Sequence, residues 1–318
     1  MEYRGGFDRA AVLKSMTGLG DLLTRVADHV PWRRALRARF ELAHARRLPT
    51  GPDGVVMGAE RIHLQGSSGR AALLLHGFND TPQSLASLAA AVHGTGYTVV
   101  APRLPGHGVC LPDMARDARS AQWRSTVAHE YAQLRTAHDT VVVCGQSMGG
   151  ALAVLLAASH PELPALVLLA PFLGMSVGMQ FQIVASMWWN FGAPYHIGTG
   201  GERSLHDPVA RVRTLGPRVF TARMMNELRT VARAAERALP RVVVPTLYLQ
   251  SREDNRISSD DAERHFAMLG SGEKEQRWVV ESGHIISADY CRDDVARQVI
   301  EWFAAHSGAE ERVSAETR

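Results

Sequence analysis

The sequence predicts an α/β fold with a mostly parallel sheet and helices on both faces. Apolar runs such as "RAALLL" and "TVVVC" lack the polar alternation of a half-exposed strand, which is typical of strands buried on both faces. Longer segments with helical spacing of apolar residues separate these runs. The 318 residues, 46% of them hydrophobic and 21% charged, are enough for one large domain of this kind.

The first 54 residues are predicted to form a helical arm that precedes this domain. A second helix of the arm is expected over residues 32–48, before the loop "LPTGPDG". The apolar face of this helix is predicted to contain Trp32, Leu36, Phe40 and Ala43. Its other face is rich in arginine, which indicates either a solvated face of a docked helix, the interpretation we favour, or a peripheral contact with a membrane surface.

Strands and helices alternate along residues 55–318. Strands are expected at about residues 70–75, 97–101, 140–146, 165–172, 244–251 and 275–282. Helices are expected at about residues 81–96, 120–137, 148–160, 259–268 and 293–306, the first of them with Pro82 in its first turn.

The alternation pauses between about residues 172 and 240. An apolar stripe at helical spacing lies in this segment, and its candidate substrate-binding residues are Met179, Ile183, Met187 and Trp188. Polar residues interrupt the stripe, so it is not expected to span a membrane. Two interpretations stay open: the stripe packs the interior of the inserted segment, or it lines an acyl-binding site.

Ser147 lies in the pentapeptide Gly145-Gln146-Ser147-Met148-Gly149, which matches G-x-S-x-G between a predicted strand and a predicted helix. In such a sharp turn, side chains two residues before and after the serine would clash, which explains both glycines. The turn strains the serine backbone and exposes the hydroxyl at the carboxyl edge of the sheet, near the positive end of the helix. Ser147 is therefore the candidate nucleophile, and a purely structural turn is the alternative.

A serine hydroxyl needs a base to take its proton, and in this arrangement a carboxylate and then a histidine follow the serine along the chain. His284 is the candidate base because it lies between the last predicted strand and the last helix. His265 and His306 lie within predicted helices and are poorly placed. The segment after the strand at 244–251 offers two carboxylates, Glu253 and Asp254.

Two backbone N–H groups are expected to stabilise the oxyanion of a tetrahedral intermediate. One belongs to Met148, directly after the serine, and the other to Phe78, in the loop after the first long strand. His76 in the same loop is interpreted as a structural brace. His107 in "PGHG" precedes the serine and is interpreted in the same way.

The chain resembles the α/β-hydrolase superfamily from about Ala59 to His306, and within it bacterial carboxylesterases and monoacylglycerol lipases. The segments that carry the resemblance are "LLLHGF", "PRLPGHG", "QWRSTV", "GQSMGG", "VPTLYLQSREDNRIS" and "SGHIISAD". The resemblance implies a serine hydrolase of carboxylic esters with a helical cap inserted after the sixth strand, and residues 172–240 fit that cap. It also favours Asp254 over Glu253 as the acid of the triad.

The chain departs from the family pattern at Asn79-Asp80, where the family often has a Thr-Gly pair. Asp80 is interpreted as a cap of the following helix or as a charge that discourages anionic substrates. The arm at residues 1–54 lies outside the resemblance.

The expected reaction is ester hydrolysis through an acyl-enzyme on Ser147. Alternatives are a thioesterase, an aminopeptidase, or a non-catalytic ligand-binding member of the fold. An aminopeptidase needs carboxylates for the substrate ammonium group, and Glu202, Glu227 and Glu236 form no obvious cluster.

No cofactor or metal is expected, and the partner is expected to be a small acyl ester. A net charge of +3 is too small to indicate nucleic acid. The three cysteines are too few for a disulfide framework, and the N-terminal sequence lacks the apolar core of a secretory signal. We therefore expect a cytoplasmic location.

Overall fold

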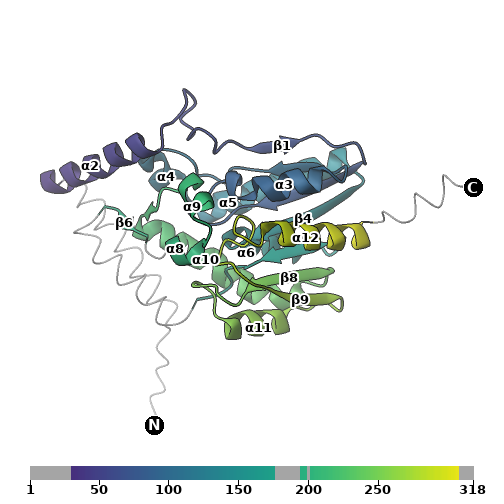
Figure 1. Ribbon diagram of the computed structural model, residues 1–318. Helices are drawn as coiled ribbons and strands as arrows, with labels where there is room; N and C mark the ends of the chain where they lie inside the picture. The colour runs from purple at the N-terminus through teal and green to yellow at the C-terminus, as the bar shows by residue number, and fades with distance from the viewer. Residues whose placement is uncertain (1–29, 176–193, 199–200, 308–318) are drawn as a thin grey trace, which may run out of the picture.

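A seven-stranded sheet forms the centre of the computed structural model, which describes residues 30–175, 194–198 and 201–307 (Figure 1). In spatial order its strands are β1 (Ile62–Leu64), β3 (Thr98–Ala101), β2 (Arg70–Leu75), β4 (Thr140–Gln146), β5 (Leu166–Leu169), β8 (Thr246–Ser251) and β9 (Lys274–Val279). β1 runs antiparallel to β3, and the other neighbouring pairs of this sheet are parallel. The predicted fold class is therefore confirmed.

The central strands are buried along almost their whole length, as their uninterrupted apolar sequences predict. In the register of β2 and β4, Leu75 lies opposite Gly145. Because the strands are parallel, the loops after β2, β4 and β8 leave the sheet at the same edge, which brings distant parts of the sequence together there.

Helices cover both faces of the sheet (Figure 1). On one face α3 (Ala86–His93) and α12 (Arg292–His306) pack on the strands and on each other. The opposite face is covered by α5 (Ser120–Ala137), α6 (Met148–Ala157), α10 (Ala222–Ala238) and α11 (Ser259–Met268).

Short elements differ most from the sequence prediction. Pro82 begins a 3₁₀ helix, η1 (Pro82–Leu85), and α3 follows it directly, so the predicted single helix has two parts. The helix α4 (Leu111–Asp117) and the strand β1 were not predicted from the sequence. Elements of this length carry too few residues to show a periodicity.

The segment between β5 and β8 interrupts the alternation of strands and helices, as expected. Its described elements are β6 (His196–Ile197), α8 (Gly201–Ser204), α9 (Pro208–Arg213), β7 (Val219–Phe220), α10 and η2 (Leu239–Arg241). β6 and β7 pair as a separate two-stranded sheet, and α10 packs against α6. Counted along the described chain, β5 is the fifth strand of the main sheet.

The arm contributes α2 (Pro31–Arg47), which contacts α4 and lies near β6 and α9 (Figure 1). The predicted apolar face is partly wrong, because Trp32 and Ala43 are exposed while Arg33 and His44 are buried. Phe40 does pack inward as predicted, and its ring lies 5.8 Å from the Tyr195 ring of the inserted segment, between centroids. The spacing of apolar residues along the helix does not predict that contact.

The division of the chain at about residue 54 stays a prediction. Within the described ranges, no helix is both long enough and apolar enough to cross a membrane.

Candidate active site

Ser147 lies in the sharp turn between β4 and α6. Its backbone has φ 55° and ψ −116°, a conformation that non-glycine residues rarely adopt. The backbone N–H of Ser147 donates to the carbonyl of Leu169 at 2.9 Å, and its carbonyl accepts from Phe172 at 3.0 Å. These bonds to the end of β5 and the segment after it hold the strained turn in place.

The glycines around Ser147 are required by close backbone approaches. A Cβ atom at Gly149 would lie 2.0 Å from the carbonyl oxygen of Leu75, and a Cβ atom at Gly145 would lie 2.3 Å from the carbonyl oxygen of Gly149. No side chain fits at either position, so α6 begins directly against the end of β2.

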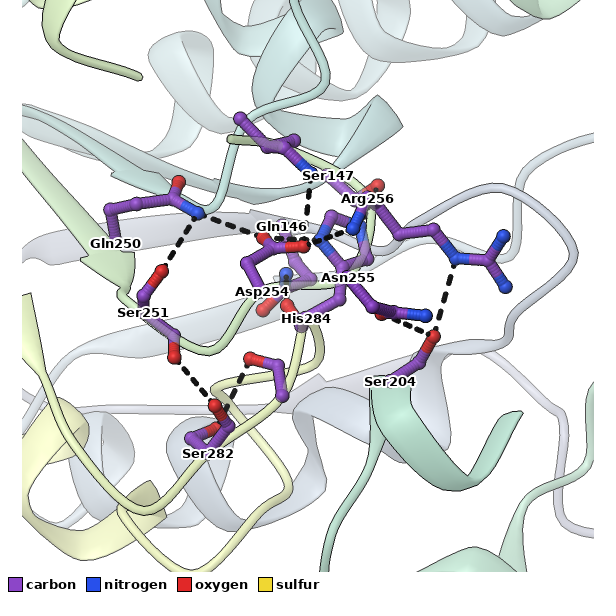
Figure 2. Close-up of polar contacts among 12 residues, drawn as sticks. Gln146, Ser147, Ser204, Gln250, Ser251, Asp254, Asn255, Arg256, Ser282 and His284 are labelled. Atoms are coloured by element: carbon purple, nitrogen blue, oxygen red, sulfur yellow. Dashed lines mark hydrogen bonds and ion pairs between the residues drawn. The ribbon is translucent and has the colours of Figure 1, made fainter. Parts of the chain in front are cut away.

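His284 lies between Ser147 and Asp254 (Figure 2). Its Nε2 atom is 2.8 Å from Oγ of Ser147, and its Nδ1 atom is 2.7 Å from Oδ2 of Asp254. A carboxylate only accepts hydrogen bonds, so Nδ1 carries the proton and Nε2 is left as an acceptor for the serine hydroxyl. The geometry therefore permits His284 to take the proton of Ser147.

The side chain of Asp254 is fully buried and is held by four donors. Its Oδ1 atom accepts from the backbone N–H groups of Arg256 (2.7 Å) and Ile257 (3.1 Å), and its Oδ2 atom accepts from Gln250 Nε2 (2.8 Å) and from His284. Burial raises the pKa of this carboxyl, but the charge of His284 and these hydrogen bonds outweigh burial, and the net pKa is lowered. Asp254 is thus held as a carboxylate beside the imidazole.

Glu253 points away from His284. One carboxylate oxygen accepts from the backbone N–H of Glu281 at 3.3 Å, and the other lies 3.8 Å from Nδ1 of His206. The structure therefore brings Asp254, and not Glu253, to the imidazole.

Both predicted oxyanion donors lie beside the nucleophile. Met148 is the first residue of α6, where a backbone N–H has no partner within the helix. A Cβ atom at Gly77 would lie only 3.8 Å from Oγ of Ser147, so the backbone that leads into Phe78 passes close to the hydroxyl. The roles of the two N–H groups as oxyanion donors stay a prediction.

His76 and His107 lie behind this loop. His76 is fully buried; its Nδ1 atom donates to the carbonyl of Gly77 (2.9 Å), and its Nε2 atom accepts from Leu104 N–H (3.1 Å). Burial lowers the pKa of His107 to about 4, and its ring packs against Phe78. Both side chains stay neutral and brace the loop, in agreement with the sequence interpretation.

Asp80 is buried two residues after Phe78. Its carboxylate accepts from the hydroxyl of Ser84 (2.6 Å) and from the N–H of Thr81 (2.8 Å) at the start of η1. Burial raises the pKa of Asp80 to about 6, although the hydrogen bonds from Ser84 and Thr81 and the charge of His284 lower it. The N-cap residue of η1 is Thr81, so Asp80 is not itself the cap, but its carboxylate binds the start of this helix.

Sequence reasoning missed the residues that hold the loop of His284. Gln146 is buried at the end of β4; its Nε2 atom donates to the carbonyl of His284 (3.0 Å), and its Oε1 atom accepts from Ser287 N–H (3.4 Å). The hydroxyl of Ser251, at the end of β8, donates to the carbonyl of Ser282 (Figure 2). A glutamine at the end of an otherwise apolar strand was the available signal for Gln146.

The predicted substrate-binding residues Met179, Ile183, Met187 and Trp188 lie outside the described residues.

A family model described as "Serine aminopeptidase, S33" matches residues 67–290, and the chain belongs to this family. The chain is 32% identical over 255 residues to a thermostable monoacylglycerol lipase from Bacillus sp. (strain H-257), which covers 80% of this chain and 98% of the relative. It is 25% identical to a carboxylesterase from Bacillus subtilis (strain 168), covering 73% of this chain and 92% of that protein.

Among solved structures, one from a study of LipS and LipT, two metagenome-derived lipolytic enzymes, is 29% identical with a TM-score of 0.72. It covers 79% of this chain and 100% of the other. The predicted resemblance to the α/β hydrolases is confirmed by the family match and by this likeness.

Proposed function

We propose that the protein hydrolyses carboxylic esters through an acyl-enzyme on Ser147, with Asp254 and His284 completing the triad. The observation that carries the proposal is the chain of two short hydrogen bonds, Ser147 Oγ to His284 Nε2 at 2.8 Å and His284 Nδ1 to Asp254 Oδ2 at 2.7 Å. That the chain is a carboxylic ester hydrolase follows from its relatives, which are named as a lipase and a carboxylesterase.

The mechanism follows from these distances. Nε2 of His284 accepts the hydroxyl proton as Oγ of Ser147 attacks the ester carbonyl, and the N–H groups of Phe78 and Met148 stabilise the oxyanion. The imidazolium then gives its proton to the leaving alcohol, and water repeats the sequence on the acyl-enzyme. Asp254 holds the imidazole in the required tautomer and stabilises its positive charge.

Replacement of Ser147 by alanine tests the proposal. We expect Ser147→Ala to abolish hydrolysis of p-nitrophenyl esters and of monoacylglycerols, with unchanged circular dichroism. Ser159→Ala is the matched control, because Ser159 is exposed after α6 and its hydroxyl donates to the carbonyl of Leu155. Retained activity in Ser147→Ala would refute the mechanism.

We propose an acyl ester as the substrate, with the names of the relatives as support. A thioesterase uses the same triad geometry, so oxygen esters and thioesters of the same acyl chain should be compared directly. A non-catalytic ligand-binding protein of this fold is the alternative from another class. Labelling of Ser147 by a fluorophosphonate probe supports hydrolysis, and the absence of labelling favours the binding protein.

An aminopeptidase activity is less well supported, although the family model carries that name. The three candidate carboxylates for a substrate ammonium group have other contacts. Glu227 accepts from the N–H (3.0 Å) and hydroxyl (2.6 Å) of Ser120, and Glu236 pairs with Arg264 at 2.8 Å. Glu202 is strongly exposed and lies 3.5 Å from Arg211. An aminoacyl p-nitroanilide is the substrate that separates the two activities.

We further propose a peripheral contact of α2 with anionic lipid. Trp32 and Leu42 are more than half exposed on this helix, and Arg39 and Arg46 lie on the same exposed side. We expect Arg39→Glu/Arg46→Glu to reduce co-sedimentation with phosphatidylglycerol vesicles. The control is Arg241→Glu, which lies in η2 at the C-terminal end of the inserted segment. The predicted cytoplasmic location stays a prediction.

A further inference from the structure

One buried carboxylate lies between the loop of His284 and the inserted segment. Asp289 is fully buried in the turn before α12. Its Oδ2 atom accepts from the N–H groups of Gly283 and His206, both at 2.8 Å. Its Oδ1 atom accepts from the N–H groups of Asp207 (2.8 Å) and Tyr290 (3.0 Å). Asp289 therefore binds the residue next to His284 and two residues of the inserted segment at once.

The two segments also touch directly. The N–H of Ile285 donates to the carbonyl of Ser204 at 2.9 Å. A Cβ atom at Gly283 would lie 2.4 Å from the carbonyl oxygen of Arg203, so only glycine permits this approach. The residues on both sides of His284 are thus held against the end of α8 and the turn that follows it.

We propose that Asp289 is a positioning residue that fixes the His284 loop against residues 203–207 of the inserted segment. Through this contact it keeps Nε2 of His284 within hydrogen-bond distance of Ser147. The inference rests on the proposed hydrolase function of the same site. It also assigns a role to the inserted segment, because residues 203–207 then help to hold the catalytic base in position.

The position requires a carboxylate. Each oxygen of Asp289 accepts two backbone N–H groups, and Oδ2 also lies 3.3 Å from the hydroxyl of Ser282. An asparagine has the same shape but only one acceptor oxygen, so its amide would face two N–H donors in either orientation. Buried donors without acceptors are costly, and the loop is expected to move to relieve them.

The test compares Asp289→Asn with Asp294→Asn. We expect Asp289→Asn to lower kcat by at least about 10-fold with little change in KM, because a small displacement of a catalytic group acts on the reaction step. Asp294→Asn is the matched control, because Asp294 lies in the first turn of α12, five residues after Asp289, and its carboxylate accepts from Nε2 of Gln298 (2.7 Å) within the same helix. Its kcat should stay within about 2-fold of the parent.

A second measurement does not depend on the substrate. The proton between Nδ1 of His284 and Asp254 gives a downfield NMR signal that His284→Gln assigns. We expect this signal to weaken or disappear in Asp289→Asn and to persist in Asp294→Asn, with all variants folded by circular dichroism. A merely structural role for Asp289 would lower the melting temperature but leave the signal and the kcat of the folded fraction unchanged.

The positioning role is overturned if Asp289→Asn keeps both the parental kcat and the signal, or if both variants lose activity equally. A parent protein that hydrolyses no ester contradicts the proposed function. In that case the NMR signal still decides whether Asp289 positions His284.

Discussion

The buried carboxylate of Asp80 makes a specific prediction for the pH dependence of stability. Only 6% of this residue is exposed, and within the described part of the chain its carboxylate accepts from the Ser84 hydroxyl and the Thr81 N–H. Burial raises its pKa from 3.8 to about 6. The folded protein therefore binds this proton more tightly than the unfolded chain does.

The magnitude follows from linkage. Since a tenfold change in proton affinity corresponds to about 1.4 kcal/mol, a pKa raised from 3.8 to about 6 corresponds to about 3 kcal/mol. The contribution has its full value below pH 3.8, where Asp80 is protonated in both states, and is lost as the pH rises through 6. Above pH 6, the ionised carboxylate lowers the free energy of unfolding by that amount.

Asp80→Asn removes the charge and keeps the shape. The amide oxygen still accepts from Thr81 N–H, and the amide group donates to the Ser84 hydroxyl, which in turn donates to the carbonyl of Thr81 (3.1 Å). We expect the stability of the variant relative to the parent to rise by about 2.5 kcal/mol between pH 4 and pH 8 in urea unfolding.

Asp261→Asn is the control with the opposite sign. The hydrogen bond from Arg264 lowers the pKa of Asp261, so its charge stabilises the folded state above the ordinary pKa. This variant should lose stability relative to the parent as the pH rises. A difference between Asp80→Asn and the parent that stays constant from pH 4 to pH 8 would refute the burial argument.

Three other substitutions test the packing around the site. Gly149→Ala places a Cβ atom 2.0 Å from the carbonyl of Leu75, so we expect at least about 2 kcal/mol of destabilisation in urea unfolding and loss of ester hydrolysis. Gln146→Leu removes the hydrogen bond to the carbonyl of His284, and we expect kcat of the folded protein to fall about 10-fold together with a loss of about 1 kcal/mol of stability. Lys274→Met leaves three carbonyls at the end of α11 without their ammonium partner, and calorimetry should show a loss of about 1 kcal/mol.

The order of the site residues along the chain could be predicted because it depends on topology. In a parallel sheet the carboxyl ends of β4 and β8 lie at one edge, so Ser147 and the carboxylate after β8 must be neighbours. The glycines of the turn could be predicted for a similar reason, since the close backbone approach follows from the strand-to-helix turn itself.

Side-chain directions did not follow from the sequence in the same way. The sequence itself did not decide whether Glu253 or Asp254 is the acid of the triad, and only the family resemblance favoured Asp254. In the structure, the N–H groups of Arg256 and Ile257 turn the Asp254 carboxylate towards His284, and the longer Glu253 reaches a different N–H. The face of α2 was partly wrong for a related reason, because Arg33 and His44, which are not apolar, are buried while Trp32 is exposed.

The support of His284 shows why the site extends beyond its triad. A histidine in a loop has no strand or helix to fix its backbone, so its position depends on contacts made by residues before and after it. Gln146 holds its carbonyl from the nucleophile turn, and Asp289 holds Gly283 together with the inserted segment. The inserted segment is thus bonded, through Asp289, to the loop of the catalytic base. Substitutions at residues 203–207 should consequently change kcat even where no side chain reaches the substrate.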